Sequence, residues 1–126
     1  MPKVLSIDDS RIMRRMIQGT AEVMGMGYLE AGCGAEGLAV LEREAADVAI
    51  ICLDVNMPGM SGLEFLRKIK ADDRFKHIPV MMVTSEACRT SIIDEVKSGA
   101  ANYVCKPFSQ EELAIKMADT LGLGVQ

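Results

Sequence analysis

The chain has 126 residues, a length that suits one domain with a proper hydrophobic core. Apolar residues make up 49%, too many for a disordered chain, yet no apolar run is long enough to span a membrane. With 14 basic and 18 acidic side chains the formal net charge is −4, which argues against nucleic acid as the main partner. The apolar segment in the opening MPKVLSIDDS is too short for a signal peptide. We therefore expect a cytoplasmic protein that does not insert into membranes.

The cysteines favour the same compartment. They are spread along the chain, form no CxxC pair and have no histidine at a metal-binding spacing. Two of them lie in apolar runs, so we interpret the set as buried thiols of a reducing cytoplasm: Cys33, Cys52, Cys88 and Cys105. The single histidine, His77, lies in a polar stretch and is expected to have no chemical role.

Short apolar runs alternate along the chain with segments whose apolar residues recur at helical spacing. The runs predict strands at residues 3–7, 28–31, 48–53, 78–83 and 101–105. The helical spacing predicts a helix after each strand, at 12–24, 34–46, 62–71, around Ile92, Ile93 and Val96, and from a cap at Ser109 to about Leu121. This order favours a single α/β domain over residues 1–126, doubly wound, with a five-stranded parallel sheet covered by helices on both faces.

The helix termini carry recognisable signals. Ser10 or Asp9 can cap the first helix, and Ser109 with Glu112 three residues later forms a capping-box pattern for the last one. In the first helix, Ile12 is expected on the apolar face with residues 13, 16, 17, 20, 21 and 24. The arginines are expected on the opposite face, as a solvated surface or a docking surface for a protein: Arg11, Arg14 and Arg15.

The residues that follow the predicted strands carry the chemistry. The first strand is followed by Asp8 and Asp9, the third by Asp54, the fourth by Thr84 and the fifth by Lys106. Each has an ordinary explanation alone, such as a helix cap or a solvated side chain. Because the carboxyl ends of parallel strands share one edge of the sheet, we expect three carboxylates, a hydroxyl and an ammonium group to gather there.

Three carboxylates in one cleft need a compensating cation, since two of them about 4 Å apart repel by roughly 4 kcal/mol at an effective dielectric near 20. Hard oxygen ligands with open positions suit Mg²⁺, which takes one or two carboxylates together with a substrate phosphate. Lys106 then offers a compact positive charge to a phosphoryl oxygen, and Thr84 offers a hydrogen bond to another. The chemistry indicated is attack by Asp54 on phosphorus, which gives an aspartyl-phosphate.

The sequence resembles the receiver domain of two-component response regulators, of the stand-alone CheY-like type, over nearly its whole length. The motifs that carry the resemblance are Asp8-Asp9, the run from Asp54 through Asn56 and Pro58 to Gly59, Thr84-Ser85 and Lys106-Pro107. The resemblance implies a flavodoxin-like fold with strand order 2-1-3-4-5. It departs from the family pattern at Ser61, where many relatives carry an acid, and this departure leaves the local helix cap open.

The resemblance implies a role for each matching residue. Asp54 is the expected phosphoacceptor, and Mg²⁺ (with Mn²⁺ as a substitute) is expected on Asp9, Asp54 and the backbone carbonyl of Asn56. Asp8 is expected to act through a metal-bound water, and Lys106 to pair with the phosphoryl group. Thr84 would bond to that group after transfer, and Tyr103 is the expected switch aromatic whose ring turns inward. Ser85 would leave the phosphoryl path open, while Asn56 and Ala87 occupy positions that tune the dephosphorylation rate.

The expected partners are a sensor histidine kinase or histidine phosphotransfer protein upstream and a target protein downstream. The target is expected on the surface of the fourth helix, fifth strand and fifth helix, with chemotaxis as the leading pathway. Because little chain follows the last helix, we expect no output domain, although a phosphorelay carrier or an excised receiver of a larger transcriptional regulator stays open. We expect a monomer, with dimer formation after phosphorylation left open, and only slow self-phosphorylation and autodephosphorylation rather than turnover.

Two other classes of protein compete with this interpretation. A Mg²⁺-dependent phosphohydrolase of the haloacid dehalogenase type would use an aspartyl-phosphate as an intermediate, but it carries a general acid two residues after the nucleophile, where this chain has Asn56. A flavodoxin-like electron carrier would need a phosphate loop after the first strand and aromatic residues beside the flavin. Here Asp8 and Asp9 would repel the flavin phosphate, and the chain has no Trp and two Tyr.

Overall fold

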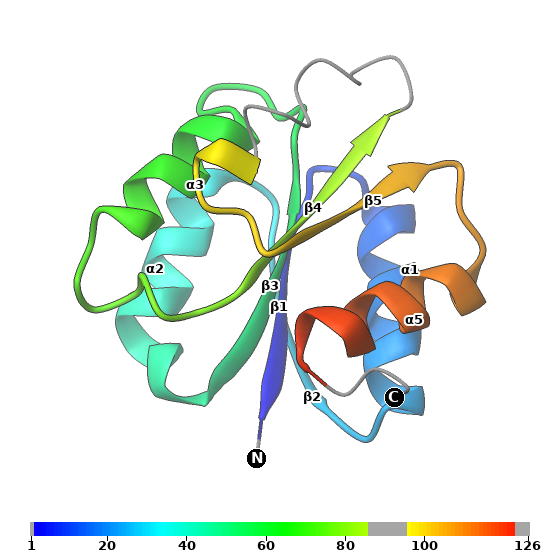
Figure 1. The fold of residues 1–126 in the computed structure, drawn as a ribbon. Helices are drawn as coiled ribbons and strands as arrows, with labels where there is room; N and C mark the ends of the chain where they lie inside the picture. Colours follow the sequence, from blue (N-terminus) through cyan, green and yellow to red (C-terminus); the bar gives the residue numbers. More distant parts are fainter. Residues whose placement is uncertain (1, 86–95, 123–126) are drawn as a thin grey trace.

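The computed structural model describes residues 2–85 and 96–122. Five parallel strands form one sheet in the order β2-β1-β3-β4-β5 (Figure 1). The strands are β1 (Lys3–Ile7), β2 (Gly27–Ala31), β3 (Val48–Asp54), β4 (Val80–Ser85) and β5 (Asn102–Lys106). The helices are α1 (Arg11–Val23), α2 (Gly34–Glu44), α3 (Gly62–Lys70) and α5 (Gln110–Thr120), with the short 3₁₀ helix η1 (Ala45–Asp47) before β3.

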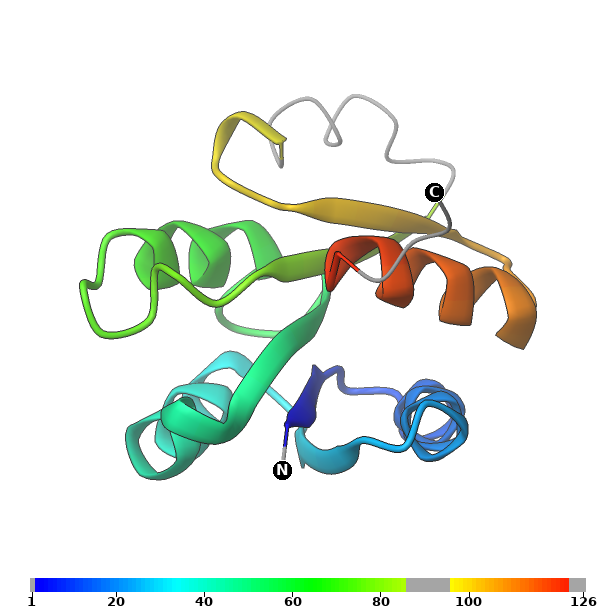
Figure 2. The ribbon, with the colours of Figure 1, turned by 60° about the horizontal axis from the view of Figure 1, so that its bottom comes forward.

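The helices cover both faces of the sheet, α1 and α5 on one side and α2 and α3 on the other (Figures 1 and 2). Successive side chains of a strand point to opposite faces, so each central strand contributes to two cores. In β3, Ile51 and Leu53 pack in the cluster that includes Phe65 of α3, while Ile50 packs with Ile17 of α1. All five side chains are fully buried, which explains why β3 reads as a continuous apolar run.

The fold class and the strand order are confirmed, and the strand boundaries differ in an informative way. β4 begins at Val80 because Pro79 has no N–H, although its carbonyl still accepts a bond from Ile51 N at 3.0 Å. Asp54, Thr84 and Lys106, expected just beyond their strands, lie within them. The hydrogen bonds between neighbouring strands therefore hold the backbones of these three residues in place. The expected helix at Ile92 and Ile93, together with Ala87 and Cys88, lies outside the described residues.

The orientation of α1 corrects the sequence analysis at two positions. Ile12 is 82% exposed, although its spacing placed it on the apolar face, and the Arg14 side chain is only 17% exposed. The helical angle explains both, because Ile12 lies about 140° around the helix from the buried Ile17, whereas Arg14 lies about 60° from it. Arg14 therefore sits beside the core edge, and Arg11 and Arg15 alone form the exposed basic surface among the three arginines.

Serine side chains cap three helices. Ser10 accepts from Met13 N and begins α1. Ser61 forms a complete capping box with Glu64, which closes the question that the unusual residue at this position raised. Ser109 accepts from Glu112 N, which is one half of the expected box. Within the described ranges, no helix is long and apolar enough to cross a membrane.

The thiol prediction holds in part. Cys52 is buried in β3, and that burial raises the pKa of its thiol to about 12. Cys33 and Cys105 are free thiols of intermediate exposure, and their positions on a loop and on the edge strand β5 account for the difference.

Candidate functional site

Three carboxylates meet at the carboxyl edge of the sheet. One oxygen from each of Asp8, Asp9 and Asp54 lies within 4.8 Å of the others. The strand register produces this meeting, because Ile7 pairs with Leu53, and the residue that follows each of them in the chain is an aspartate, Asp8 just after β1 and Asp54 at the end of β3. Asp8 and Asp54 are 1% and 4% exposed, whereas Asp9 is open to solvent. The cluster is thus a partly enclosed cup with one exposed wall.

Asp8 is fixed on one side and unpaired on the other. Its backbone N–H donates to the Ala31 carbonyl at 3.1 Å, and its Oδ1 accepts from Ser10 N at 2.8 Å. Its Oδ2 is buried and has no hydrogen-bond partner among the described residues. An unpaired buried carboxylate oxygen is unfavourable unless a cation or an ordered water fills the space beside it.

Asp54 ends β3 and faces a lysine from the far side of the site. Lys106 Nζ, at the end of β5, lies 3.4 Å from Asp54 Oδ1, and Asn56 N also donates to that oxygen at 3.4 Å. Gly62, the first residue of α3, allows the chain to return directly beneath Asp54. A Cβ on Gly62 would overlap the Asp54 carbonyl oxygen and lie 2.8 Å from Val55 Cα. The position of Asp54 therefore depends on a glycine eight residues away.

Burial raises the pKa of both buried carboxyls. For Asp8 the pKa rises from 3.8 to about 6, because burial outweighs the N–H of Ser10 and because Asp54 lies nearby. The pKa of Asp54 also rises through burial, against the opposing charge of Lys106 and the N–H of Asn56. One ammonium group does not fully compensate three acids, so the site has a strong demand for additional positive charge.

The remaining predicted residues lie around this cup at different depths. Thr84 is buried near the end of β4, and its Oγ1 lies 3.5 Å from the Ser85 carbonyl. Tyr103 pairs with Met82, further from the edge, and its ring lies 5.1 Å from Lys116 Nζ of α5. Asn56 is exposed and follows Asp54 by two residues. The structure thus brings Asp8, Asp9, Asp54 and Lys106 together, with Thr84 near the same edge of the sheet. Tyr103 lies further from that edge.

The donor set fits Mg²⁺. Three carboxylates converge on one space, one buried oxygen is unpaired, and oxygen ligands with an open, exposed side suit an ion that keeps several waters. Asp9, Asp54 and Asp8 would hold the ion from three directions. A bound divalent cation would supply the missing positive charge, and it would lower the pKa of both buried carboxyls.

Two contributors to the site escaped the sequence analysis. Arg14 donates from Nη1 to the Asp8 backbone carbonyl at 2.6 Å, although it was assigned to the solvated face. Its spacing of three residues from Ile17 was the signal that could have located it. Gly62 was predicted only as the first residue of the helix over residues 62–71, and nothing local in the sequence indicates that it touches Asp54.

The five-stranded order and the acidic cup define a class of protein, and comparison with known proteins gives the same class. The profile of the response regulator receiver domain family matches residues 4–118. The chain therefore belongs to the response regulator receiver domain family. This family consists of signalling domains, so the assignment favours a signalling protein over the phosphohydrolase and the flavin carrier.

Individual relatives are similar over almost the full length. The chain is 40% identical to chemotaxis protein CheY1 of Helicobacter pylori, covering 95% of this chain and 97% of that protein. It is 40% identical to chemotaxis protein CheY of Pseudomonas aeruginosa, covering 91% of this chain and 92% of that protein. Among solved structures, chemotaxis response regulator CheY4 of Vibrio cholerae superposes with a TM-score of 0.87 at 33% identity, covering 96% and 99% of the two chains.

Proposed function

We propose that this chain is a chemotaxis response regulator that accepts a phosphoryl group on Asp54 and thereby changes its affinity for a partner protein. The observation that carries the proposal is the position of Asp54, 4% exposed, 3.4 Å from Lys106 Nζ and clustered with two further carboxylates. Asp54 lies with Asp8 and Asp9 in the cluster and is also the acid that pairs with Lys106. That arrangement suits a nucleophile whose attacking oxygen is aligned from both sides.

The transfer is a displacement at phosphorus. A carboxylate oxygen of Asp54 forms a bond to phosphorus while the phosphorus–nitrogen bond of a phosphohistidine breaks, and the imidazole keeps the electron pair and later takes a proton from solvent. Lys106 neutralises charge on a phosphoryl oxygen, in place of its ion pair with Asp54. Asp8, Asp9 and Asp54 would hold the divalent cation, which would supply positive charge for the phosphoryl oxygens. The Asn56 carbonyl completes the proposed ligand set.

The readout begins at Thr84. Phosphorylation replaces one negative charge by nearly two and adds acceptor oxygens beside this buried hydroxyl. A hydrogen bond to a charged group contributes roughly 1.5–3 kcal/mol, which shifts a two-state equilibrium by about ten- to a hundredfold if it forms in one state only. Tyr103 is the proposed second element of the switch. It is half-buried on β5, two residues before Cys105, which pairs with Thr84.

The target is proposed to bind on the surface of β5 and α5, where Ile115 is 55% exposed and Lys116 lies over the Tyr103 ring. The helix expected around Ile92, Ile93 and Val96, which would belong to the same proposed surface, falls mostly outside the described residues. The relatives named as chemotaxis proteins favour chemotaxis over a phosphorelay or a larger transcriptional regulator. We further propose one receiver domain over residues 1–126, acting as a cytoplasmic monomer with slow autodephosphorylation.

Transfer from a labelled phosphohistidine tests the assignment. We expect the label of a phosphorylated chemotaxis histidine kinase to move to the wild-type chain with Mg²⁺ present, and not to the Asp54→Asn variant. Glu64→Gln is the matched control, because Glu64 is an exposed carboxylate ten residues further on that caps α3 and lies outside the acidic cluster. Stable labelling of Asp54→Asn at the wild-type level would exclude Asp54 as the acceptor.

A further inference from the structure

A largely buried arginine holds the backbone that carries two of the three acids. Arg14 Nη1 donates to the Asp8 carbonyl at 2.6 Å, and the side chain is 17% exposed. That carbonyl belongs to the peptide that joins Asp8 to Asp9. The bond therefore restrains the plane of the peptide from which the exposed Asp9 side chain projects. Charged donors make the stronger hydrogen bonds to such acceptors.

The guanidinium is itself held from behind by the edge strand. Arg14 Nε lies 3.4 Å from Glu30 Oε1, on β2, as an ion pair without a hydrogen bond, since this Nε has no hydrogen-bond partner among the described residues. The Tyr28 hydroxyl lies 3.1 Å from the same carboxylate oxygen and 2.9 Å from the Arg14 backbone carbonyl, and its single proton is donated to one of these two acceptors at a time. These contacts join α1, β2 and the loop after β1. Arg14 is thus a fixed strut between the edge of the sheet and the acid-bearing loop.

We propose that Arg14 is a positioning residue for the divalent cation, which it serves by holding the Asp8–Asp9 peptide in the orientation that lets both acids reach one ion. The inference rests on the proposed Mg²⁺-dependent function. According to this proposal Arg14 strengthens Mg²⁺ binding, although its positive charge alone would weaken it. A positive charge near an acidic cluster repels Mg²⁺, so simple electrostatics predicts that removal of Arg14 tightens binding. Loss of a strut predicts weaker binding, and loss of an outer support typically lowers metal affinity by ~10–100-fold.

Three substitutions separate the two effects. Arg14→Met keeps the apolar stem but removes charge and donor, Arg14→Gln removes the charge but keeps a donor, and Arg14→Lys keeps both. Arg15→Ala is the matched control, because Arg15 is the next residue and pairs with Glu30 at 3.1 Å but has no bond to the Asp8 carbonyl. Circular dichroism and urea unfolding of each full-length chain establish that it is folded.

The measurement is the Mg²⁺ dissociation constant by isothermal titration calorimetry of the metal-free protein, without a phosphodonor. We expect Arg14→Met to bind about tenfold more weakly, with Arg14→Gln and Arg14→Lys closer to wild type and Arg15→Ala unchanged or slightly tighter. With acetyl phosphate, Arg14→Met should need more Mg²⁺ for half-maximal phosphorylation yet reach nearly the wild-type rate at saturation. Wild-type or tighter binding by Arg14→Met would overturn the role of Arg14.

The outcomes remain distinguishable in less favourable cases. If Arg14→Met does not fold, the comparison of Arg14→Gln with the wild type decides: tighter Mg²⁺ binding by Arg14→Gln supports the charge effect and contradicts the strut. If the wild-type chain itself binds no Mg²⁺, the proposed function fails along with the inference. If wild-type binding is normal and all Arg14 variants match it, only the inference fails.

Discussion

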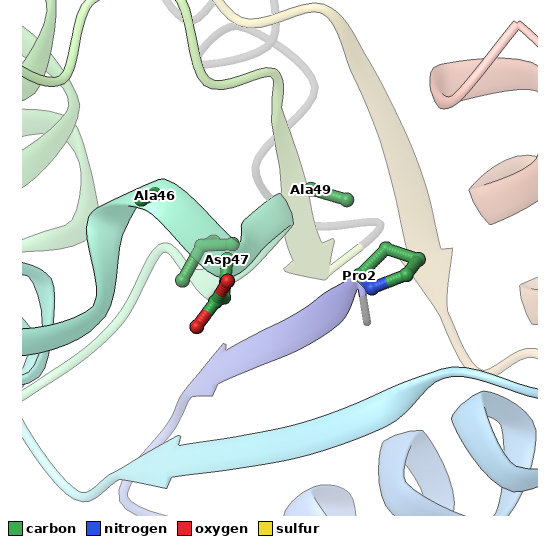
Figure 3. A pocket seen from close by; sticks show the side chains of 5 residues that line it. Pro2, Ala46, Asp47 and Ala49 are labelled. Carbon is green, nitrogen blue, oxygen red and sulfur yellow. The ribbon is translucent and has the colours of Figure 1, made fainter.

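The two edges of the sheet are built from the same five strands and behave differently. At the carboxyl edge, Asp8 and Asp54 are buried, and one oxygen of Asp8 is unpaired within the described part of the chain. At the amino edge, a hollow of about 240 Å³ is lined by Pro2, Ala46, Asp47, Val48 and Ala49 (Figure 3). Asp47 is exposed there and is the one carboxylate of the lining. The hollow at the amino edge is therefore not where the acids of the cluster meet.

At the amino edge, a positive and a negative side chain pair with each other. Lys3 Nζ pairs with Glu44 at 2.9 Å, and both side chains remain partly in water. At the carboxyl edge, burial raises the pKa of Asp8 and of Asp54, and the negative charge of neighbouring acids raises both further. The comparison teaches that the site is recognised by unfavourable electrostatics that a ligand can relieve, rather than by the size of a cavity.

The largest difference in stability is expected between alanine substitutions of two glycines, one at each edge of the sheet. Gly62→Ala should lower the free energy of unfolding by about 3 kcal/mol or more, because the new Cβ would overlap the Asp54 backbone, and phosphorylation should fall with it. Gly25, before β2, has φ +72° and nothing within 4 Å of a built Cβ, so Gly25→Ala should lose only about 1–2 kcal/mol. Urea unfolding of both variants measures the difference. Equal losses would show that Asp54 does not depend on this close approach.

The next effect is a gain in stability at the carboxyl edge. The pKa of the Asp8 carboxyl rises from 3.8 to about 6 on folding. The metal-free protein therefore loses stability as pH rises between these values, by up to about 3 kcal/mol, and the loss is complete above pH 6. Asp8→Asn removes this titration. We therefore expect it to raise the free energy of unfolding at pH 7.5 by about 2 kcal/mol in EDTA, with little gain at pH 4.

Asp47→Asn is the control for this prediction, because Asp47 is exposed at the other edge and should show no such pH-dependent gain. Chemical denaturation at both pH values makes the comparison. A stability loss in Asp8→Asn at pH 7.5 would mean that the buried acid is compensated within the protein.

Mg²⁺ should stabilise the protein through the carboxyl edge alone. At ten times its dissociation constant a bound ion adds about 1.4 kcal/mol to the free energy of unfolding. We expect this increment in the wild type and in Asp47→Asn, and its loss in Asp9→Asn, which removes one ligand charge from the cluster. Thermal unfolding with Mg²⁺ or EDTA measures it. An increment that survives in Asp9→Asn would place the ion elsewhere.

Most of the fold could be predicted from the sequence, because the signals for strands and helix ends act over a few neighbouring residues. The apolar run of β3 and the serine caps at Ser10 and Ser109 each act within a few residues, and they predicted the order and type of the elements. Ile12 was misplaced because the apolar spacing of α1 admits two rotations of the helix, and packing against the sheet selects the one that buries Ile17. The strand order came from the family resemblance, since periodicity does not determine which strands are neighbours.

The site was predictable to the extent that it lies at strand ends. Asp8, Asp9, Asp54 and Lys106 meet because parallel strands share an edge, and that rule needs no coordinates. The contact of Arg14 with the Asp8 carbonyl was not predictable, because it depends on the helix rotation that the sequence left ambiguous. Burial of individual acids, and hence the raised pKa of Asp8, also required the packed structure.

The central claim is tested most directly by intact mass and peptide mapping after incubation with acetyl phosphate, once with Mg²⁺ and once with EDTA. The account predicts a gain of one phosphoryl group that requires Mg²⁺, maps to the peptide containing Asp54 and is absent from Asp54→Ala. A gain that persists in Asp54→Ala, or that is equal in EDTA, would contradict it. Release of inorganic phosphate without any adduct would instead indicate a phosphohydrolase.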